Sequence, residues 1–293
     1  MYEYRKAIVV CADDYGLSMG VCDAIEALIE KGRLSATGAM TDIPAWRRRA
    51  EGLRALVRAH PADIGLHFTL TGQRPLSPAK GLARDGRLPE IGALALRALA
   101  GALPRAAIRD ELRAQLDAFE DEWDAPPDFL DGHQHAHALP GIRDIVIAEL
   151  GLRYAGRLPW LRNCTEQAAW ACKGGIGFRK AMIVGTLGAG TASAAAKAGI
   201  ASNDSFRGLY GFTPAPPYRD IFRAALAGPG ERVLVHCHPG VVDEELRALD
   251  PLLEPREWEL AYLSSEACGE DLAAAGVRPA RFAETGSASA TRG

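Results

Sequence analysis

KAIVVCADD, residues 6–14, is a short β-branched run that ends in two aspartates. Such a run is typical of a strand buried on both faces, as in a parallel sheet that helices cover. A helix is predicted directly after it, because Ser18 is a suitable N-cap and Gly32 stands where a C-terminal cap belongs. The first unit of the fold is therefore a strand followed by a helix.

The same alternation continues along the sequence. Later strands are predicted over 34–42, 62–72, 127–135 and 231–240, with a strand end at 152–160. Helices are predicted over 45–60, 105–123 and 140–150. Strands that alternate with helices indicate a parallel sheet with the helices outside it. We therefore expect an α/β fold: a single-domain, irregular (β/α) barrel that is TIM-barrel-like.

A length of 293 residues suits one domain of this kind. We expect the domain to cover 1–284 and a flexible tail to cover 285–293. Residues 72–104 resemble a long insertion, for which a lid or a binding loop is expected. Residues 181–196 carry no charge. A buried or lid-forming helix and a surface for an apolar substrate or another subunit both stay open for that segment.

Composition and charge exclude several classes of function. The formal net charge of -3 provides no basic field for nucleic acid. The first apolar run and the uncharged segment 181–196 are both too short to span a membrane, so we expect a cytoplasmic protein. The six cysteines form no C-x-x-C pair, which favours buried, reduced thiols. A homo-oligomer stays open.

The histidines and the acidic residues near them fall at predicted strand ends. Six of the seven histidines lie in three short segments, GLHFTL, DGHQHAH and VHCHPG. Because active sites of such barrels lie at the carboxyl ends of the strands, these side chains are expected to gather there. The set comprises Asp13, Asp14, His67, Asp131, His133, His236 and His238.

One aspartate and two histidines form a ligand set that suits zinc or another divalent ion. Such an ion lowers the pKa of a bound water and polarises a carbonyl oxygen, as amide hydrolysis requires. The reaction also needs a general base and a general acid. Of the adjacent Asp13 and Asp14, one can bind the ion while the other acts as base. His238 is the candidate acid, and His236 is expected to orient a partner.

Four segments resemble the signatures of the YdjC/ChbG-like carbohydrate deacetylases. These are CADDYGLS (11–18), IGLHFTLTGQRPL (64–76), FLDGHQHAH (129–137) and HCHPG (236–240). The resemblance runs from about residue 7 to residue 282. RLPW (157–160) and SNDSFRGLYGF (202–212) are similar to the HpnK branch, which is associated with hopanoid biosynthesis.

The resemblance implies a distorted (β/α) barrel that removes the acetyl group from an N-acetylated amino sugar. It implies that Asp14, His67 and His133 bind the metal, with His135 as the alternative to His133. It also implies that Asp13 is the base and His238 the acid. Further residues are expected to orient ligands, base or substrate: Asp131, His135, His137, His236 and Arg157.

The cofactor is expected to be one divalent ion, with Mg²⁺ or Zn²⁺ as first choices and Co²⁺ or Mn²⁺ as alternatives. The substrate is expected to be an oligosaccharide or a glycolipid. Candidates for contact with a sugar ring are Trp46, Trp160, Trp170, Tyr210 and Phe212. Other functions considered are a different metal-dependent amidohydrolase or phosphoesterase and a non-catalytic carbohydrate-binding barrel. An amidohydrolase usually carries its H-x-H pair on the first strand, where this chain has Asp13 and Asp14.

Overall fold

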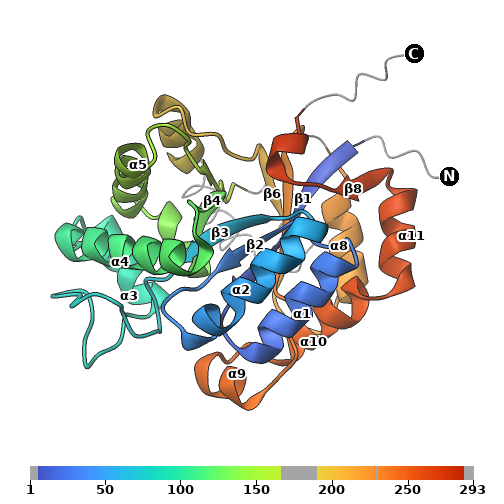
Figure 1. Cartoon of the computed structure of the whole chain (residues 1–293), viewed down its shortest axis with the longest axis horizontal. Helices are drawn as coiled ribbons and strands as arrows, with labels where there is room; N and C mark the ends of the chain where they lie inside the picture. Colours follow the sequence, from blue (N-terminus) through green and yellow to red (C-terminus); the bar gives the residue numbers. More distant parts are fainter. Residues whose placement is uncertain (1–5, 166–189, 229, 287–293) are drawn as a thin grey trace.

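The centre of the molecule is a parallel β-sheet with helices packed around it (Figure 1). The computed structural model describes residues 6–165, 190–228 and 230–286. The strands are β1 (Lys6–Tyr15), β2 (Ala36–Ala39), β3 (Asp63–Phe68), β4 (Phe129–Gly132), β5 (Trp160–Leu161), β6 (Ser205–Arg207), β7 (Val233–Cys237) and β8 (Val277–Pro279). The helices are α1 (Met19–Glu30), α2 (Pro44–Ala59), α3 (Ile91–Leu99), α4 (Arg105–Trp123), α5 (Ile142–Arg153), α8 (Tyr218–Leu226), α9 (Glu244–Leu249), α10 (Glu254–Leu263) and α11 (Glu266–Ala274). Two 3₁₀ turns, η1 (His133–Ala138) and η2 (Phe282–Glu284), complete the elements described.

The sheet is a half-barrel. Its strands lie in the order β5-β4-β3-β2-β1-β7-β6, and β8 pairs with β1 beside this path. Each edge strand bonds to a segment that flanks the other: Leu161 N of β5 donates to Ala201 O before β6 (2.9 Å), and Phe206 N of β6 donates to Thr165 O after β5 (3.3 Å). The predicted irregular α/β barrel with parallel strands is confirmed.

Strand β1 is an inner strand that pairs with β2 on one side and β7 on the other, and its residues from Ile8 onward are buried, as its β-branched run predicts. The predicted start of α1 is confirmed, since the Ser18 hydroxyl accepts a hydrogen bond from Val21 N (3.3 Å). Gly32 follows α1 with φ +68, the left-handed conformation that favours glycine after a helix. The strand–helix unit read from residues 6–32 is therefore present.

Helices α2 and α4 occupy the predicted ranges. The apolar face of α4 is buried as expected, at Ile108, Leu112, Leu116, Phe119 and Trp123. Helix α5 continues through Gly151 to Arg153 instead of closing at the glycine. The reason is that Gly151 keeps a helical conformation and Tyr154 N still bonds to Leu150 O (2.9 Å).

Two predicted segments differ from the structure. Strand β4 stops at Gly132, and His133–Ala138 forms η1, in which Gln134 (φ 52) and His135 (φ 59) are left-handed. The expected strand over 127–135 is therefore too long. The insertion 72–104 contains helix α3, whose Leu94 and Ala98 are buried; its role as a lid stays a prediction.

Some expectations concern residues that the structure does not describe. Most of the uncharged segment 181–196, together with Trp170 and Cys172, lies outside the described ranges. The five cysteines within them are free and buried. No helix in the described part of the chain is long and apolar enough to cross a membrane.

Candidate active site

The carboxyl ends of β1, β3, β4 and β7 bring the predicted polar residues together. A bulge in the β1–β2 ladder lies between Ala12 and Tyr15 and contains both Asp13 and Asp14. Neighbouring strand residues normally point to opposite faces, and a bulge breaks that rule. Asp14 has φ 68, a conformation that costs energy in a non-glycine residue and is concentrated at functional sites. This local geometry lets two consecutive carboxylates face one site.

Asp14, His67 and His133 form the candidate metal centre. Asp14 Oδ1 lies 3.2 Å from His67 Nε2 and 3.0 Å from His133 Nδ1. The three ligand atoms all lie within 4.8 Å of one another. One ion with ligand bonds of about 2.0–2.2 Å fits such a set. Asp14 and His67 are buried, whereas the His133 side chain is 14% exposed, so the centre is reached from that side.

Asp131 fixes the ring of His67. Its Oδ1 lies 2.7 Å from His67 Nδ1, which leaves His67 Nε2 to face Asp14. A carboxylate behind a histidine ligand is a common feature of metal sites. Burial lowers the pKa of His67, but Asp131 and Asp14 outweigh burial and raise it to about 10. An ion that binds here must therefore displace a proton.

Asp13 is held by Arg162, which lies directly after β5. The Arg162 guanidinium donates to both Asp13 oxygens (2.7 and 2.6 Å) and lies 2.5 Å from Asp131 Oδ2. Burial alone raises the pKa of Asp13, but Arg162 reverses this and holds it well below its usual range. Cys11, Asp13 and Asp131 are also spaced closely enough for a metal. Arg162 contacts all three side chains, so its guanidinium already provides a positive charge beside that cluster.

His238 lies beside Asp13, just after β7. Its Nε2 is 3.9 Å from Asp13 Oδ2, and its backbone N–H donates to Glu259 Oε2 (2.5 Å). Burial lowers the pKa of His238 to about 3. Burial likewise raises the pKa of Glu259 to about 7. The predicted base and acid are thus neighbours.

Arg256 of α10 contacts the candidate metal centre from the opposite end of the sequence. Its Nη2 donates to Asp14 Oδ2 (2.6 Å) and to Asp250 Oδ2 (2.7 Å). Burial raises the pKa of Asp14, but Arg256 and then His133 outweigh burial, so this pKa lies well below its usual range. Asp14 therefore stays a carboxylate.

The remaining histidines lie outside this centre. His135 packs edge-on against Phe206 and His236, with ring centroids 5.3 and 5.7 Å away. His236 Nδ1 is 2.9 Å from Arg207 O, and His137 Nε2 is 3.0 Å from Arg162 O. Of the two candidates His133 and His135, the structure thus places His133 beside Asp14.

Arg157 is not beside the base. Its side chain is 82% exposed and lies 3.4 Å from Asp128, which precedes β4 at the amino end of the sheet. Arg162 contacts the base instead, so the expectation that Arg157 orients the base is corrected, whereas its alternative role of orienting the substrate stays a prediction. Arg162 directly follows β5, as His133 directly follows β4, so its place after a strand could have identified it as a site residue. Arg256 and Glu259 had no such signal, because they lie inside a helix.

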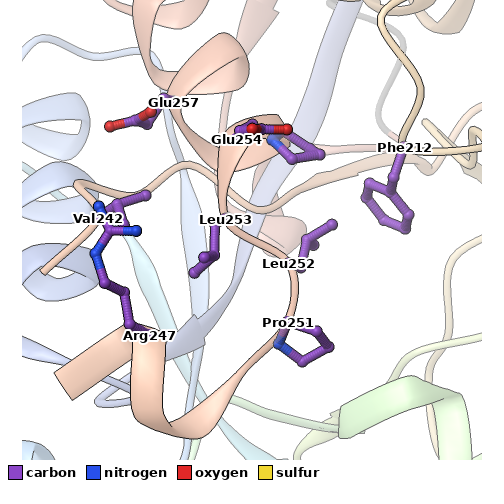
Figure 2. Close-up of a pocket in the computed structure, with 9 residues that line it drawn as sticks. Phe212, Val242, Arg247, Pro251, Leu252, Leu253, Glu254 and Glu257 are labelled. Atoms are coloured by element: carbon purple, nitrogen blue, oxygen red, sulfur yellow. The ribbon is translucent and has the colours of Figure 1, made fainter. Parts of the chain in front are cut away.

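A pocket of about 550 Å³ lies next to the site (Figure 2). Phe212, Leu252 and Leu253 line it together with charged residues such as Arg247 and Glu257. The Phe212 ring lies 5.5 Å from the His238 ring, in an edge-on arrangement. Among the aromatic candidates, Trp46 is instead buried and stacked on Phe119, and Trp160 is stacked on Phe129.

The fold and site define an α/β half-barrel protein with a carboxylate–histidine cluster at the carboxyl ends of its strands. The sequence model described as YdjC-like protein matches residues 7–274, so the chain belongs to the YdjC-like family. The expected family is thereby confirmed.

The chain is similar to named deacetylases over all or part of its length. The chitooligosaccharide deacetylase of Klebsiella pneumoniae (strain 342) is 31% identical over 278 residues, which are 94% of this chain and 97% of the relative. The carbohydrate deacetylase of Mus musculus is 35% identical over 57% of this chain and 54% of its own length. The crystal structure of a proposed cellobiose-phosphate cleavage protein from Enterococcus faecalis V583 superposes with a TM-score of 0.72. It covers 95% of this chain and 98% of its own and is 19% identical, which supports the fold alone.

Proposed function

We propose that this protein is a metal-dependent hydrolase that removes the acetyl group from an N-acetylated amino sugar. The observation that carries the proposal is the meeting of Asp14, His67 and His133 within 4.8 Å, with Asp13 and His238 beside them. Relatives named chitooligosaccharide deacetylase, similar over nearly their whole length, support the same reaction.

Asp14, His67 and His133 would hold one divalent ion, for which Mg²⁺ or Zn²⁺ are our first choices and Co²⁺ or Mn²⁺ the alternatives. When bound, such an ion lowers the pKa of a water and polarises an amide carbonyl. The three side chains suit a divalent ion. Asp131 contacts Nδ1 of His67 and not Nε2, and Arg256 contacts Oδ2 of Asp14 and not Oδ1, so Nε2 and Oδ1 are the atoms that would bind the ion.

Asp13 and His238 supply the proton transfers in our proposal. Arg162 keeps Asp13 deprotonated, so its carboxylate is ready to take a proton from the attacking water. His238 rests in its neutral form, because burial lowers its pKa to about 3. Asp13 Oδ2 and His238 Nε2 are 3.9 Å apart. In our proposal this gap closes in the substrate complex, as catalytic hydrogen bonds commonly do, and the proton then passes from Asp13 to His238. His238 then delivers it to the departing amine, which leaves acetate and a free amino sugar.

The substrate would bind in the pocket beside His238. A volume of about 550 Å³ lies within the range of small-molecule sites, roughly 300–1,000 Å³. Phe212 offers a ring face to a sugar, and Arg247 and Glu257 offer partners for hydroxyl groups. The proposed substrate is either an oligosaccharide or a glycolipid. The similarity to the HpnK branch is the reason for including the glycolipid.

The direct test is acetate release from N,N′-diacetylchitobiose and from an N-acetylglucosaminyl lipid, with each divalent ion in turn. Asp13→Asn is expected to lower kcat by at least about 100-fold, as loss of a general base does. Metal content should stay near that of the unmodified protein, because Asp13 does not belong to the candidate metal centre.

Asp63→Asn is the matched control, because Asp63 is a buried aspartate that starts β3 at the amino end of the sheet. It should retain turnover. Full activity in Asp13→Asn would overturn the assignment of the base. Sugar binding without acetate release under any ion would favour the non-catalytic alternative.

Three further expectations remain proposals: one domain over 1–284, a cytoplasmic location and a homo-oligomer. Light scattering after size-exclusion chromatography measures the last of these directly.

A further inference from the structure

Helix α10 contains two charged residues that are fully buried, Arg256 and Glu259. They are three positions apart and therefore lie on one face of the helix. Burying a charge is expensive unless it is paired. Both side chains reach the candidate active site, whereas Glu254 and Glu257 of the same helix line the neighbouring pocket (Figure 2).

Arg256 determines which oxygen of Asp14 faces the histidines. Its Nη2 lies 2.6 Å from Asp14 Oδ2, and the other oxygen, Oδ1, contacts His67 and His133. The same nitrogen is anchored by Asp250 at 2.7 Å. Arg256 Nε also donates to Leu252 O (3.0 Å), which ties the guanidinium to the loop before α10. The carboxylate of Asp14 is therefore held in a single orientation.

Glu259 holds His238 from the side opposite Asp13. Its Oε2 accepts from the His238 backbone N–H (2.5 Å), and its Oε1 accepts from the Tyr210 hydroxyl (2.7 Å). The same Oε1 lies 4.0 Å from His238 Nδ1, whereas Asp13 lies 3.9 Å from His238 Nε2. The imidazole thus lies between two carboxylates, and a positive charge on it is stabilised from both sides.

We propose that Arg256 and Glu259 are positioning residues of the reaction: Arg256 orients Asp14 for the metal, and Glu259 orients His238 and favours its protonated form. This inference rests on the proposed function. It assigns α10 a part in the chemistry, in addition to packing.

The Arg256 half is tested by metal affinity, which needs no turnover. Arg256→Met should weaken binding of Zn²⁺ and Mn²⁺ by about 10–100-fold in calorimetric titration, the usual effect of removing a group behind a metal ligand. Arg256→Lys should recover part of that loss, because it restores one charged donor. Arg113→Met, which breaks an arginine–carboxylate pair between α4 and α5, should leave the affinity unchanged.

Unchanged metal affinity in a folded Arg256→Met protein would overturn this half of the proposal. If Arg256→Met does not fold, Arg256→Lys carries the test. An affinity of Arg256→Lys equal to that of the unmodified protein then overturns the proposal, and a several-fold loss supports it.

The Glu259 half is tested by Glu259→Gln, which keeps an oxygen for the His238 N–H but removes the charge. We expect kcat to fall by about 10–100-fold with KM unchanged. The pKa of the His238 ring should fall further below its usual value, because a protonated His238 loses its neighbouring carboxylate. The other titratable or charged groups that face this pair are unaltered: Asp13, Asp14, Tyr210, Tyr218, His236, Cys237 and Arg256.

Glu111→Gln is the matched control, because Glu111 is a fully buried glutamate of α4 that bonds to Leu76 N and Ser77 N. It should leave kcat and the pKa of His238 unchanged. NMR titration of the His238 ring in the metal-loaded protein measures this pKa without turnover. A His238 pKa equal in Glu259→Gln and the unmodified protein would refute the role of Glu259, whereas a protein that never releases acetate refutes only the proposed function.

Discussion

Gly38 shows how one residue controls the geometry of the metal centre. It lies on β2 and faces side chains of β3 and β4, and a Cβ there would lie 3.0 Å from both Asp131 Oδ1 and His67 Nδ1. Those two atoms are themselves only 2.7 Å apart. The absence of a side chain at Gly38 is therefore what allows Asp131 to reach His67.

Gly38→Ala should push Asp131 and His67 apart by a few tenths of an ångström. We expect metal affinity to fall by about 10-fold, because the ring of His67 loses its support. Overpacking should also cost about 1–3 kcal/mol in the free energy of unfolding. Calorimetric metal titration and urea unfolding measure the two effects.

Gly52→Ala provides the comparison, because a Cβ at Gly52 on α2 meets no atom within 4 Å. It should stabilise the protein by about 0.5–1 kcal/mol without changing metal binding. Equal metal affinity in the two variants would show that the space at Gly38 does not matter.

At the level of elements, the sequence predicted those parts whose signal is local. The β-branched run of β1, the cap at Ser18 and the apolar face of α4 each depend on neighbouring residues, and all three are present. Strand ends then placed Asp14 and His67 at one edge of a parallel sheet. That inference needed only the direction of the strands.

The parts that the sequence did not predict depend on tertiary contacts. The left-handed residues of the 3₁₀ turn η1 end the strand that we predicted there. With this turn, His133 contacts Asp14 and His137 contacts Arg162 O, both across the fold. The roles of Arg162 and Arg256 depend on which carboxylate each one meets across the fold. No periodicity within α10 indicates that its arginine contacts β1.

At the amino end of the sheet, the first residue of β3, Asp63, connects three elements. Asp63 Oδ2 accepts from Phe282 N (2.8 Å) and from Trp160 Nε1 (3.4 Å), so it joins β3 to η2 and β5. Burial raises the pKa of Asp63 to about 6. Folding therefore favours the protonated acid, and stability is lost as the pH rises from the unfolded-state value of about 3.9 through 6.

Asp63→Asn should remove this pH-dependent penalty while keeping an acceptor for Phe282 N. Between pH 4 and pH 7.5, the free energy of unfolding of the variant should rise by up to about 3 kcal/mol relative to that of the unmodified protein. This value follows from a pKa shift of about 2 units at about 1.4 kcal/mol per unit. Urea unfolding across that range measures it. Asp85→Asn, at an exposed aspartate, should give a flat difference, and a flat difference for Asp63→Asn would contradict the prediction.

At the scale of the whole molecule, the two ends of the half-barrel have separate tasks. The carboxyl ends of the strands gather Asp13, His67 and His238, whereas the amino ends hold Asp63 and Asp128 in contacts that stabilise the fold. Substitutions at the amino end are therefore expected to act on stability and those at the carboxyl end on chemistry.

The neighbouring aspartates of β1 each have an arginine of their own, Arg162 for Asp13 and Arg256 for Asp14. Within the described ranges, the second group of metal-spaced ligands therefore already has a positive charge beside it, on an Arg162 side chain that cannot dissociate. We therefore expect a mononuclear centre, in which this edge of the sheet takes one exchangeable cation instead of the bridged pair of ions that many hydrolases use.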